Sequence, residues 1–188
     1  GLSAWEAKTT LVDVDIDANA WFTSGEDDNS VAFAARLMEQ DVQVRIVDKE
    51  TLLTDKKISR GSVFVTAMDN PLKKGLTDLI SKEASRLGIS IESTSSGYGA
   101  GVLPDWGGQH FRLLSSPKIA ILSQSKFSSY DVGVSWWGID HYLGIRHSQL
   151  DTSYLRGADL RRYNTIVVPN GYRAVSEAEQ KVLSDWVK

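Results

Sequence analysis

The chain has 188 residues, 41% hydrophobic and 24% charged, a composition typical of a soluble globular protein with one large domain or two small ones. Its 24 acidic residues outnumber its 21 basic ones, so no basic surplus can neutralise phosphates, and nucleic acid is excluded as an expected partner. The sequence has no run of about 18 apolar residues and no basic start followed by an apolar segment, which excludes a membrane span and a signal peptide among these residues.

Residues 1–93 are predicted to form an α/β module with the order strand, helix, strand, strand, helix, strand. Residues 9–17 alternate apolar and acidic side chains, which indicates a strand. Helices are expected at residues 29–40 and 71–87, the second opening on a proline and ending at a glycine. The other strands are expected at residues 42–47, 61–66 and 89–92. Residues 94–116 are rich in Gly and Ser and are predicted to form a connector.

Residues 117–188 are predicted to be half of a doubly wound α/β domain with a mostly parallel sheet. Its strands are expected at residues 119–122 and 165–168. A helix is predicted between them at 131–143. One of its two tryptophans, Trp136 and Trp137, is expected in the core and the other at an interface, and a ligand-stacking platform is the less favoured alternative. The stretch 176–179 has the pattern of a capping box and predicts a last helix.

The acidic series Asp13, Asp15 and Asp17 invites a calcium interpretation. A calcium-binding loop that starts at Asp13 would need a glycine where Ala18 stands and a carboxylate where Ser24 stands. The period of two favours the solvated edge of a strand instead. No metal site is therefore predicted there.

Zinc is not predicted in this chain either. The chain has no cysteine, and its histidines are His110, His141 and His147. None of them stands in a His-Glu-x-x-His or His-x-x-Glu pattern. We therefore expect no cofactor in this chain.

The carboxyl ends of the two predicted strands hold the best candidates for a ligand site, because α/β sheets bind ligands at that edge. The candidate ligand-binding residues are Ser123, Ser125, Ser128, Asn170 and Gly171. No G-x-S-x-G turn is present and no base is placed beside these serines, so no residue is assigned a catalytic role. Turn formation and helix capping are the roles that the sequence favours for the serines.

Several segments together resemble known proteins. Residues 112–121 and 129–136 resemble the entry to a class I glutamine amidotransferase-like domain, and residues 163–171 resemble its next strand and turn. This particular version of the amidotransferase-like domain is similar to the carboxyl-terminal region of bacterial zinc carboxypeptidases of the carboxypeptidase A superfamily. Residues 19–25 and 61–65 resemble the module that those proteins place before it. The resemblance implies a flavodoxin-like sheet preceded by a smaller α/β module.

The departures from that family decide the expected function. Its peptidase domain binds zinc through a His-x-x-Glu pair and a distant histidine, and this chain has no such pair. In active amidotransferases the nucleophilic cysteine follows a further strand, which would lie after Lys188. The resemblance therefore implies a non-catalytic accessory region, with zinc confined to an upstream peptidase domain.

The implied partners are that upstream domain of the same polypeptide and a small ligand, and the parent protein is expected to be a secreted or periplasmic metallocarboxypeptidase. The chain opens on Gly1 and ends within a predicted helix, so we expect a piece of a longer protein. Two alternatives stay open. One is a fragment of an amidotransferase or hydrolase whose nucleophile lies beyond Lys188, and the other is a small-molecule sensor domain.

Overall fold

The chain divides into two compact units, Gly1–Ser115 and Ser116–Lys188. The computed structural model describes residues 11–54, 56–124, 126–171 and 175–188. Within those ranges no helix has the length and apolar character that a membrane span requires. The first unit extends beyond the module predicted at residues 1–93.

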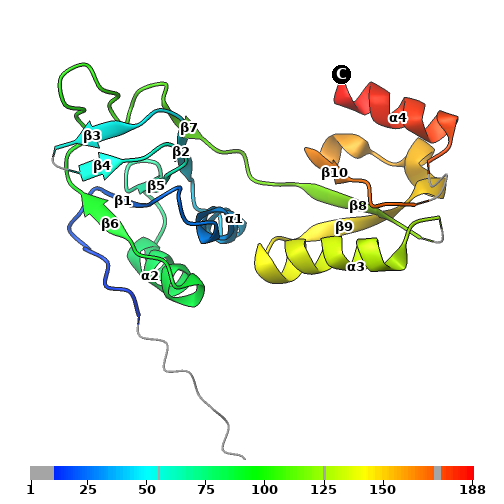
Figure 1. The fold of residues 1–188 in the computed structure, drawn as a ribbon, viewed down its shortest axis with the longest axis horizontal. Helices are drawn as coiled ribbons and strands as arrows, with labels where there is room; N and C mark the ends of the chain where they lie inside the picture. The colour runs from blue at the N-terminus through cyan, green and yellow to red at the C-terminus, as the bar shows by residue number, and fades with distance from the viewer. Residues whose placement is uncertain (1–10, 55, 125, 172–174) are drawn as a thin grey trace, which may run out of the picture. The chain divides into compact units, whose positions relative to one another are not determined.

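Unit 1 is built on a five-stranded antiparallel sheet with the order β6-β1-β5-β2-β7 (Figure 1). The strands are β1 (Ala20–Thr23), β2 (Arg45–Val47), β5 (Val63–Thr66), β6 (Glu92–Thr94) and β7 (Phe111–Leu113). All residues of the two central strands β1 and β5 are buried, and Phe22 lies opposite Phe64 in their register. Since both faces of these strands are buried, both must be covered by other elements.

Two helices cover one face of this sheet. Helices α1 (Asn29–Glu39) and α2 (Leu76–Leu87) contact each other, and Phe33 of α1 and Ile80 of α2 belong to the same core cluster as Trp21 and Val65 of the strands. Trp21 and Val65 lie opposite each other in the register, so their side chains share one face. The larger core of unit 1 therefore lies between the sheet and the helix pair.

The second face packs on a hairpin and a loop. The hairpin consists of β3 (Thr51–Leu53) and β4 (Lys56–Ile58), whose inward residues Leu53 and Ile58 are fully buried. These side chains form a cluster with Phe22, Phe64 and Phe111, and Trp106 packs against it. This hairpin was not predicted from the sequence, because each strand is only three residues long and β4 opens on two lysines, a residue type depleted in strands.

The predicted connector belongs largely to unit 1. Within residues 94–116, Trp106 packs on the ring of Phe64 and Asp105 accepts a hydrogen bond from the Gly99 amide at 2.6 Å. Residues 111–113 form the edge strand β7, paired with β2. A segment that covers one sheet face and supplies an edge strand is part of the unit, and the division between units falls after Ser115.

The strand predicted at residues 9–17 is absent over its described part, 11–17. The backbone of this segment pairs with side chains instead of a neighbouring strand: the Val12 amide donates to the Ser85 hydroxyl at 2.6 Å, and the Val12 carbonyl accepts from Ser81. Both serines lie on α2. The three aspartates of the segment are exposed, which agrees with the solvated acidic face that the sequence predicted.

Helix α2 begins later than the sequence predicted. Pro71 lies in a turn, and Gly75 adopts φ 67°, a left-handed conformation that an α-helix cannot include. The Asn70 side chain accepts from the Gln43 amide at 2.7 Å and so is not available as a helix cap. Gly88 ends the helix with φ 69°, as predicted.

Unit 2 contains a three-stranded parallel sheet in the order β10-β8-β9. Its strands are β8 (Ile119–Ser123), β9 (His147–Asp151) and β10 (Thr165–Val167). All five residues of β8 are buried, and Figure 1 shows α3 (Ser129–Trp137) and α4 (Glu177–Val187) on opposite sides of the sheet. Mixed α/β content is thus confirmed, with parallel pairing in this sheet and antiparallel pairing in unit 1.

Both adjacent tryptophans of α3 are largely exposed. Trp136 is 41% exposed and Trp137 54% exposed, and no residue of α3 is buried. The prediction that one of them lies in the core is wrong. The apolar anchor on this side is Ile139, in the π-helical turn Gly138–Tyr142 that continues α3.

Helix α4 begins at the predicted capping box. The Ser176 hydroxyl accepts from the Glu179 amide, and the Glu179 carboxylate accepts from the Ser176 amide at 2.7 Å. Further along the helix, the Trp186 indole donates to the Leu160 carbonyl at 2.9 Å. The capping box stabilises the start of α4, and the Trp186 bond attaches its other end to the 3₁₀ turn Leu160–Arg162.

Replacing Glu179 with alanine is expected to lower the stability of unit 2 by about 1 kcal/mol, because one half of the capping box is removed. The hydrogen bond from the Ser176 backbone N–H is the main cause that lowers the pKa of Glu179. The stability that the substitution removes therefore comes from the ionised carboxylate of Glu179. Amide hydrogen exchange in the first turn of α4 measures the effect. The exposed Glu177 provides the control, and its replacement with alanine should change exchange little.

Candidate functional site

An open cleft of roughly 780 Å³ lies at the carboxyl end of β8. It is lined by residues from β8, β9, α3 and the turn between β8 and α3. The lining residues are Ser123, Gln124, Phe127, Ser129, Val132, Gly133, Trp136 and Gln149. Its volume is within the range of small-molecule sites, and its position is the edge where parallel sheets bind ligands.

Ser123 is the last residue of β8 and contributes a hydroxyl without a partner. The residue is 4% exposed, and its Oγ has no hydrogen-bond partner in the described structure. Leaving a buried hydroxyl unpaired costs about 1–3 kcal/mol. The next residue, Gln124, has φ 90°, a conformation that disfavours any residue other than glycine. An unpaired polar group and a strained backbone therefore meet beside the cleft.

The amino terminus of α3 lies at the same end of the sheet. The Ser128 hydroxyl caps the helix by accepting from the Asp131 amide at 3.3 Å. The Ser128 amide donates to the Asn170 carbonyl at 2.8 Å, which ties the start of α3 to the segment that follows β10. The segments that follow β8 and β10 are thus joined by a backbone hydrogen bond.

The five predicted ligand-binding residues have different positions. Ser123 lines the cleft, and Ser128 caps α3 and contacts the backbone of Asn170. Asn170 and Gly171 follow β10 and are not among the residues that line the cleft. Ser125 lies outside the described residues.

Sequence reasoning missed Gln149 and Trp136 as parts of the site. Gln149 lies on β9, opposite Ile121 of β8 in the parallel register. The β9 sequence carries one aliphatic residue among five, so no alternation of apolar and polar residues predicted a strand there. For Trp136 the sequence favoured a core or interface position over ligand stacking. Its position four residues from Val132, one helical turn away, is the pattern that connects it with the cleft.

The lining of the cleft is uncharged. The nearby Lys126 ammonium pairs with the Glu179 carboxylate at 3.4 Å, and Asp151 at the end of β9 accepts from the Ser153 amide at 2.9 Å. Among the described residues, the lining of the cleft therefore offers hydroxyls, carboxamides and apolar surface, and no side chain of formal charge.

The histidines do not form a metal site. His110 bonds Asp48 at 2.7 Å, and the His141 ring lies 5.1 Å from that of Trp137. His147 opens β9, at the opposite end of the strand from Asp151, and its Nδ1 is buried without a partner. Across residues 11–188, apart from those the structure does not describe, no three His, Asp or Glu side chains come together as metal ligands.

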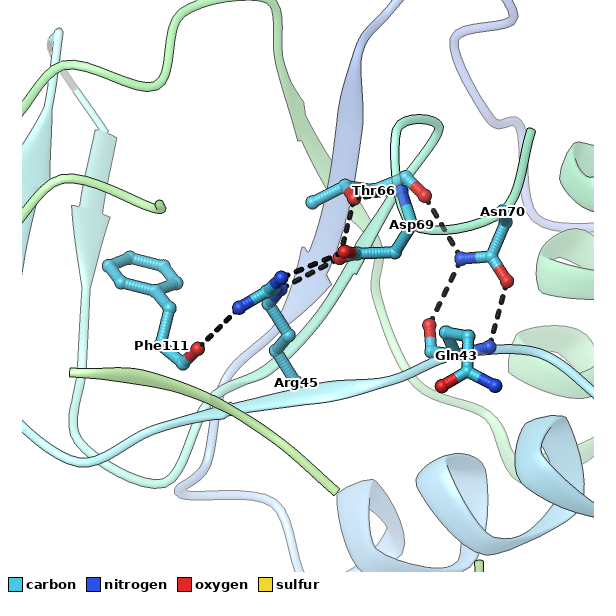
Figure 2. Close-up of polar contacts among 6 residues, drawn as sticks. All are labelled: Gln43, Arg45, Thr66, Asp69, Asn70 and Phe111. Carbon is cyan, nitrogen blue, oxygen red and sulfur yellow. Dashed lines mark hydrogen bonds and ion pairs between the residues drawn. The ribbon is translucent and has the colours of Figure 1, made fainter. Parts of the chain in front are cut away.

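A polar cluster of unit 1 forms a structural network (Figure 2). Arg45 donates to both Asp69 oxygens, at 2.7 and 2.8 Å, and to the Phe111 carbonyl at 2.8 Å. Asp69 also accepts from the Thr66 hydroxyl at 2.7 Å. Beside it, the Asn70 side chain bonds the backbone of Gln43 in both directions. Because these partners bond one another, the cluster ties β2, β7 and the turn after β5 together.

Comparisons of the chain with protein-family profiles, with curated proteins and with solved structures find no match. The function is therefore inferred from the residues and geometry of the chain itself, and the cleft at the carboxyl end of β8 is the feature that carries the inference.

Proposed function

We propose that the chain is a non-catalytic accessory region of a zinc carboxypeptidase-like protein, and that unit 2 binds a small ligand in the cleft at the end of β8. The observation that carries the binding role is the buried, unpaired Ser123 hydroxyl at that cleft. The Oγ atom is itself buried, so a rotation of the Ser123 side chain toward the cleft would let a ligand satisfy it, at the position where α/β sheets bind their ligands.

The strand order supports the amidotransferase-like, flavodoxin-like part of the proposal. In chain order the strands are β8, β9 and β10, and β8 lies between the other two. A flavodoxin-like sheet begins in this way, with its first strand between the second and the third. Unit 2 corresponds to the first half of such a doubly wound domain.

Binding is favoured over turnover by the chemistry of the lining. A serine nucleophile needs a base within hydrogen-bond reach, and among the described lining residues none is a His, Asp, Glu or Lys. Asp151, the register partner of Ser123, accepts from the Ser153 amide and makes no hydrogen bond with the Ser123 hydroxyl. Under this proposal the peptidase chemistry, with its zinc, belongs to an upstream domain of the same polypeptide. Unit 2 then serves to position that domain or to report ligand binding.

The binding role is tested with a panel of charged and neutral small molecules, by following amide and indole NMR shifts of the whole chain. Ligands that bind in the cleft should shift the NMR signals of Ser123, Gln149 and Trp136 together. Replacing Ser123 with alanine should abolish or weaken those shifts while leaving the protein as stable or up to about 1 kcal/mol more stable, because the unpaired hydroxyl is gone.

The matched control is the exposed Ser153, whose replacement with alanine should leave both binding and stability unchanged. If no compound of the panel shifts the NMR signals of the cleft residues, the binding role is overturned. A second assay addresses the absence of catalysis: the chain supplied with zinc should not release carboxyl-terminal amino acids from peptides. Turnover that survives purification would contradict the proposal.

A further inference from the structure

The cleft at the end of β8 has a distinctive chemical composition. Its polar groups are the hydroxyls of Ser123 and Ser129 and the carboxamides of Gln124 and Gln149. Each of these groups both donates and accepts hydrogen bonds. They therefore complement ligand groups that also do both, and hydroxyl groups are the simplest of these.

The sheet register places two of these groups together. Residues two apart on a strand share a face, so Ile121 and Ser123 of β8 point to the same side. Gln149 is the parallel partner of Ile121, and Asp151 is that of Ser123, so Gln149 shares the face of Ser123. A carboxamide and the unpaired hydroxyl are thus held on neighbouring strands, which are more rigid supports than loops.

The apolar side of the cleft comes from α3 and the preceding turn. Phe127, Val132 and Trp136 line it, and Trp136 keeps 41% of its surface exposed. A half-exposed indole offers a flat apolar face at the rim with its polar edge in water. Such a face suits a ligand that has C–H groups on one side and hydroxyls on its edge.

The charges around the cleft disfavour an anion. The amino terminus of α3 by itself would attract one, but Asp131 lies in its first turn and reduces that field. Asp151 follows at the end of β9, next to Ser123 in the register. Asp151 already accepts a backbone hydrogen bond, so it is partly engaged and does not by itself specify a cation.

We propose that the ligand of the cleft is a neutral polyhydroxylated molecule of the size of a mono- or disaccharide. The proposal rests on the proposed function, since it names the class of ligand for the same site. Trp136 stacks on the C–H face of the ring, while Gln149 and Ser123 bond its hydroxyls. The two carboxylates at the edge exclude phosphorylated or carboxylated forms.

Three probes that share one sugar ring separate neutral, anionic and cationic ligands: they are glucose, glucose 6-phosphate and glucosamine. Cellobiose is the larger neutral probe. Titrations followed by NMR should show saturable millimolar binding of glucose or cellobiose, with shifts at Gln149 and the Trp136 indole. We expect affinity for the phosphate to be weaker by about tenfold or more, because no lining residue carries a positive charge.

Three variants locate the binding. Replacing Trp136 with alanine, or Gln149 with leucine, should weaken neutral-sugar binding by about tenfold. Trp137 is the matched control: it is the next residue, it is exposed, and it does not line the cleft. Replacing Trp137 with alanine should leave the affinity unchanged.

The outcomes separate this inference from the proposed function. Preferred binding of glucose 6-phosphate or glucosamine at the cleft overturns the neutral class and leaves the binding role intact. The neutral class is also overturned, and the binding role kept, if another panel compound shifts the NMR signals of the cleft residues while none of the four sugar probes does. Absence of any cleft ligand overturns both, and equal loss of affinity in the Trp136 and Trp137 variants removes the assigned site.

Discussion

Replacing Asp69 with alanine is expected to lower the free energy of unfolding of unit 1 by about 2–3 kcal/mol. The side chains of Arg45 and Asp69 are 21% and 14% exposed and share a two-pronged ion pair. Without the carboxylate, the guanidinium keeps its desolvation and loses two charge-assisted hydrogen bonds. The Thr66 hydroxyl loses its acceptor in the same step.

The same pair predicts a dependence on pH. The hydrogen bond from Arg45 is the main cause that lowers the pKa of Asp69 below its ordinary value. A carboxyl group whose pKa is lower in the folded state adds stability that is fully present above its unfolded pKa. That stability is lost as the pH falls through the folded pKa. Unit 1 should therefore lose stability in acid, and the Asp69→Asn variant should lose less.

Native-state hydrogen exchange at the β5 amides measures this effect in unit 1 alone. The control is Glu50, which pairs with Lys57 at 3.1 Å while both side chains are more than half exposed. Replacing Glu50 with glutamine should change exchange by less than about 0.5 kcal/mol, since solvent screens such a pair. If replacing Asp69 with alanine and replacing Glu50 with glutamine had equal effects on exchange, the Asp69 network would add no special stability.

The parts of the fold that the sequence predicted correctly have local causes. The capping box at Ser176 and Glu179 and the helix stop at Gly88 each depend on backbone groups within a few residues. The fully buried strand β8 is a continuous apolar run, which is the pattern of a central parallel strand. Such features are readable because no distant residue is needed to define them.

The parts that sequence reasoning missed depend on partners far along the chain. Strand β9 is polar because it lies at an edge of the sheet, and its pairing with β8 defines it. Residues 11–17 alternate like a strand, but their backbone bonds serines of α2 more than sixty residues away. The candidate site shares this problem, since Gln149 joins Ser123 only through the β8–β9 register.

Replacing Phe64 with alanine is expected to destabilise unit 1 by about 3–5 kcal/mol, the largest effect of any substitution considered in that unit. Phe64 is fully buried at the centre of the second sheet face. Its ring contacts Phe22 at 5.8 Å, Phe111 at 5.0 Å and Trp106 at 5.8 Å between centroids. Three aromatic contacts are lost together, and the cavity lies between the sheet and the loop that contains Trp106.

The position of the cavity gives the prediction a second readout. Because Trp106 packs on Phe64, hydrogen exchange of residues 95–108 should accelerate with that of β5 if the loop is an integral part of unit 1. Tyr98 in the same loop is 81% exposed, and its replacement with alanine should change neither the exchange of residues 95–108 nor that of β5. Acceleration confined to β5, with the loop unchanged, would instead mean that residues 95–108 hold their structure independently of the second sheet face.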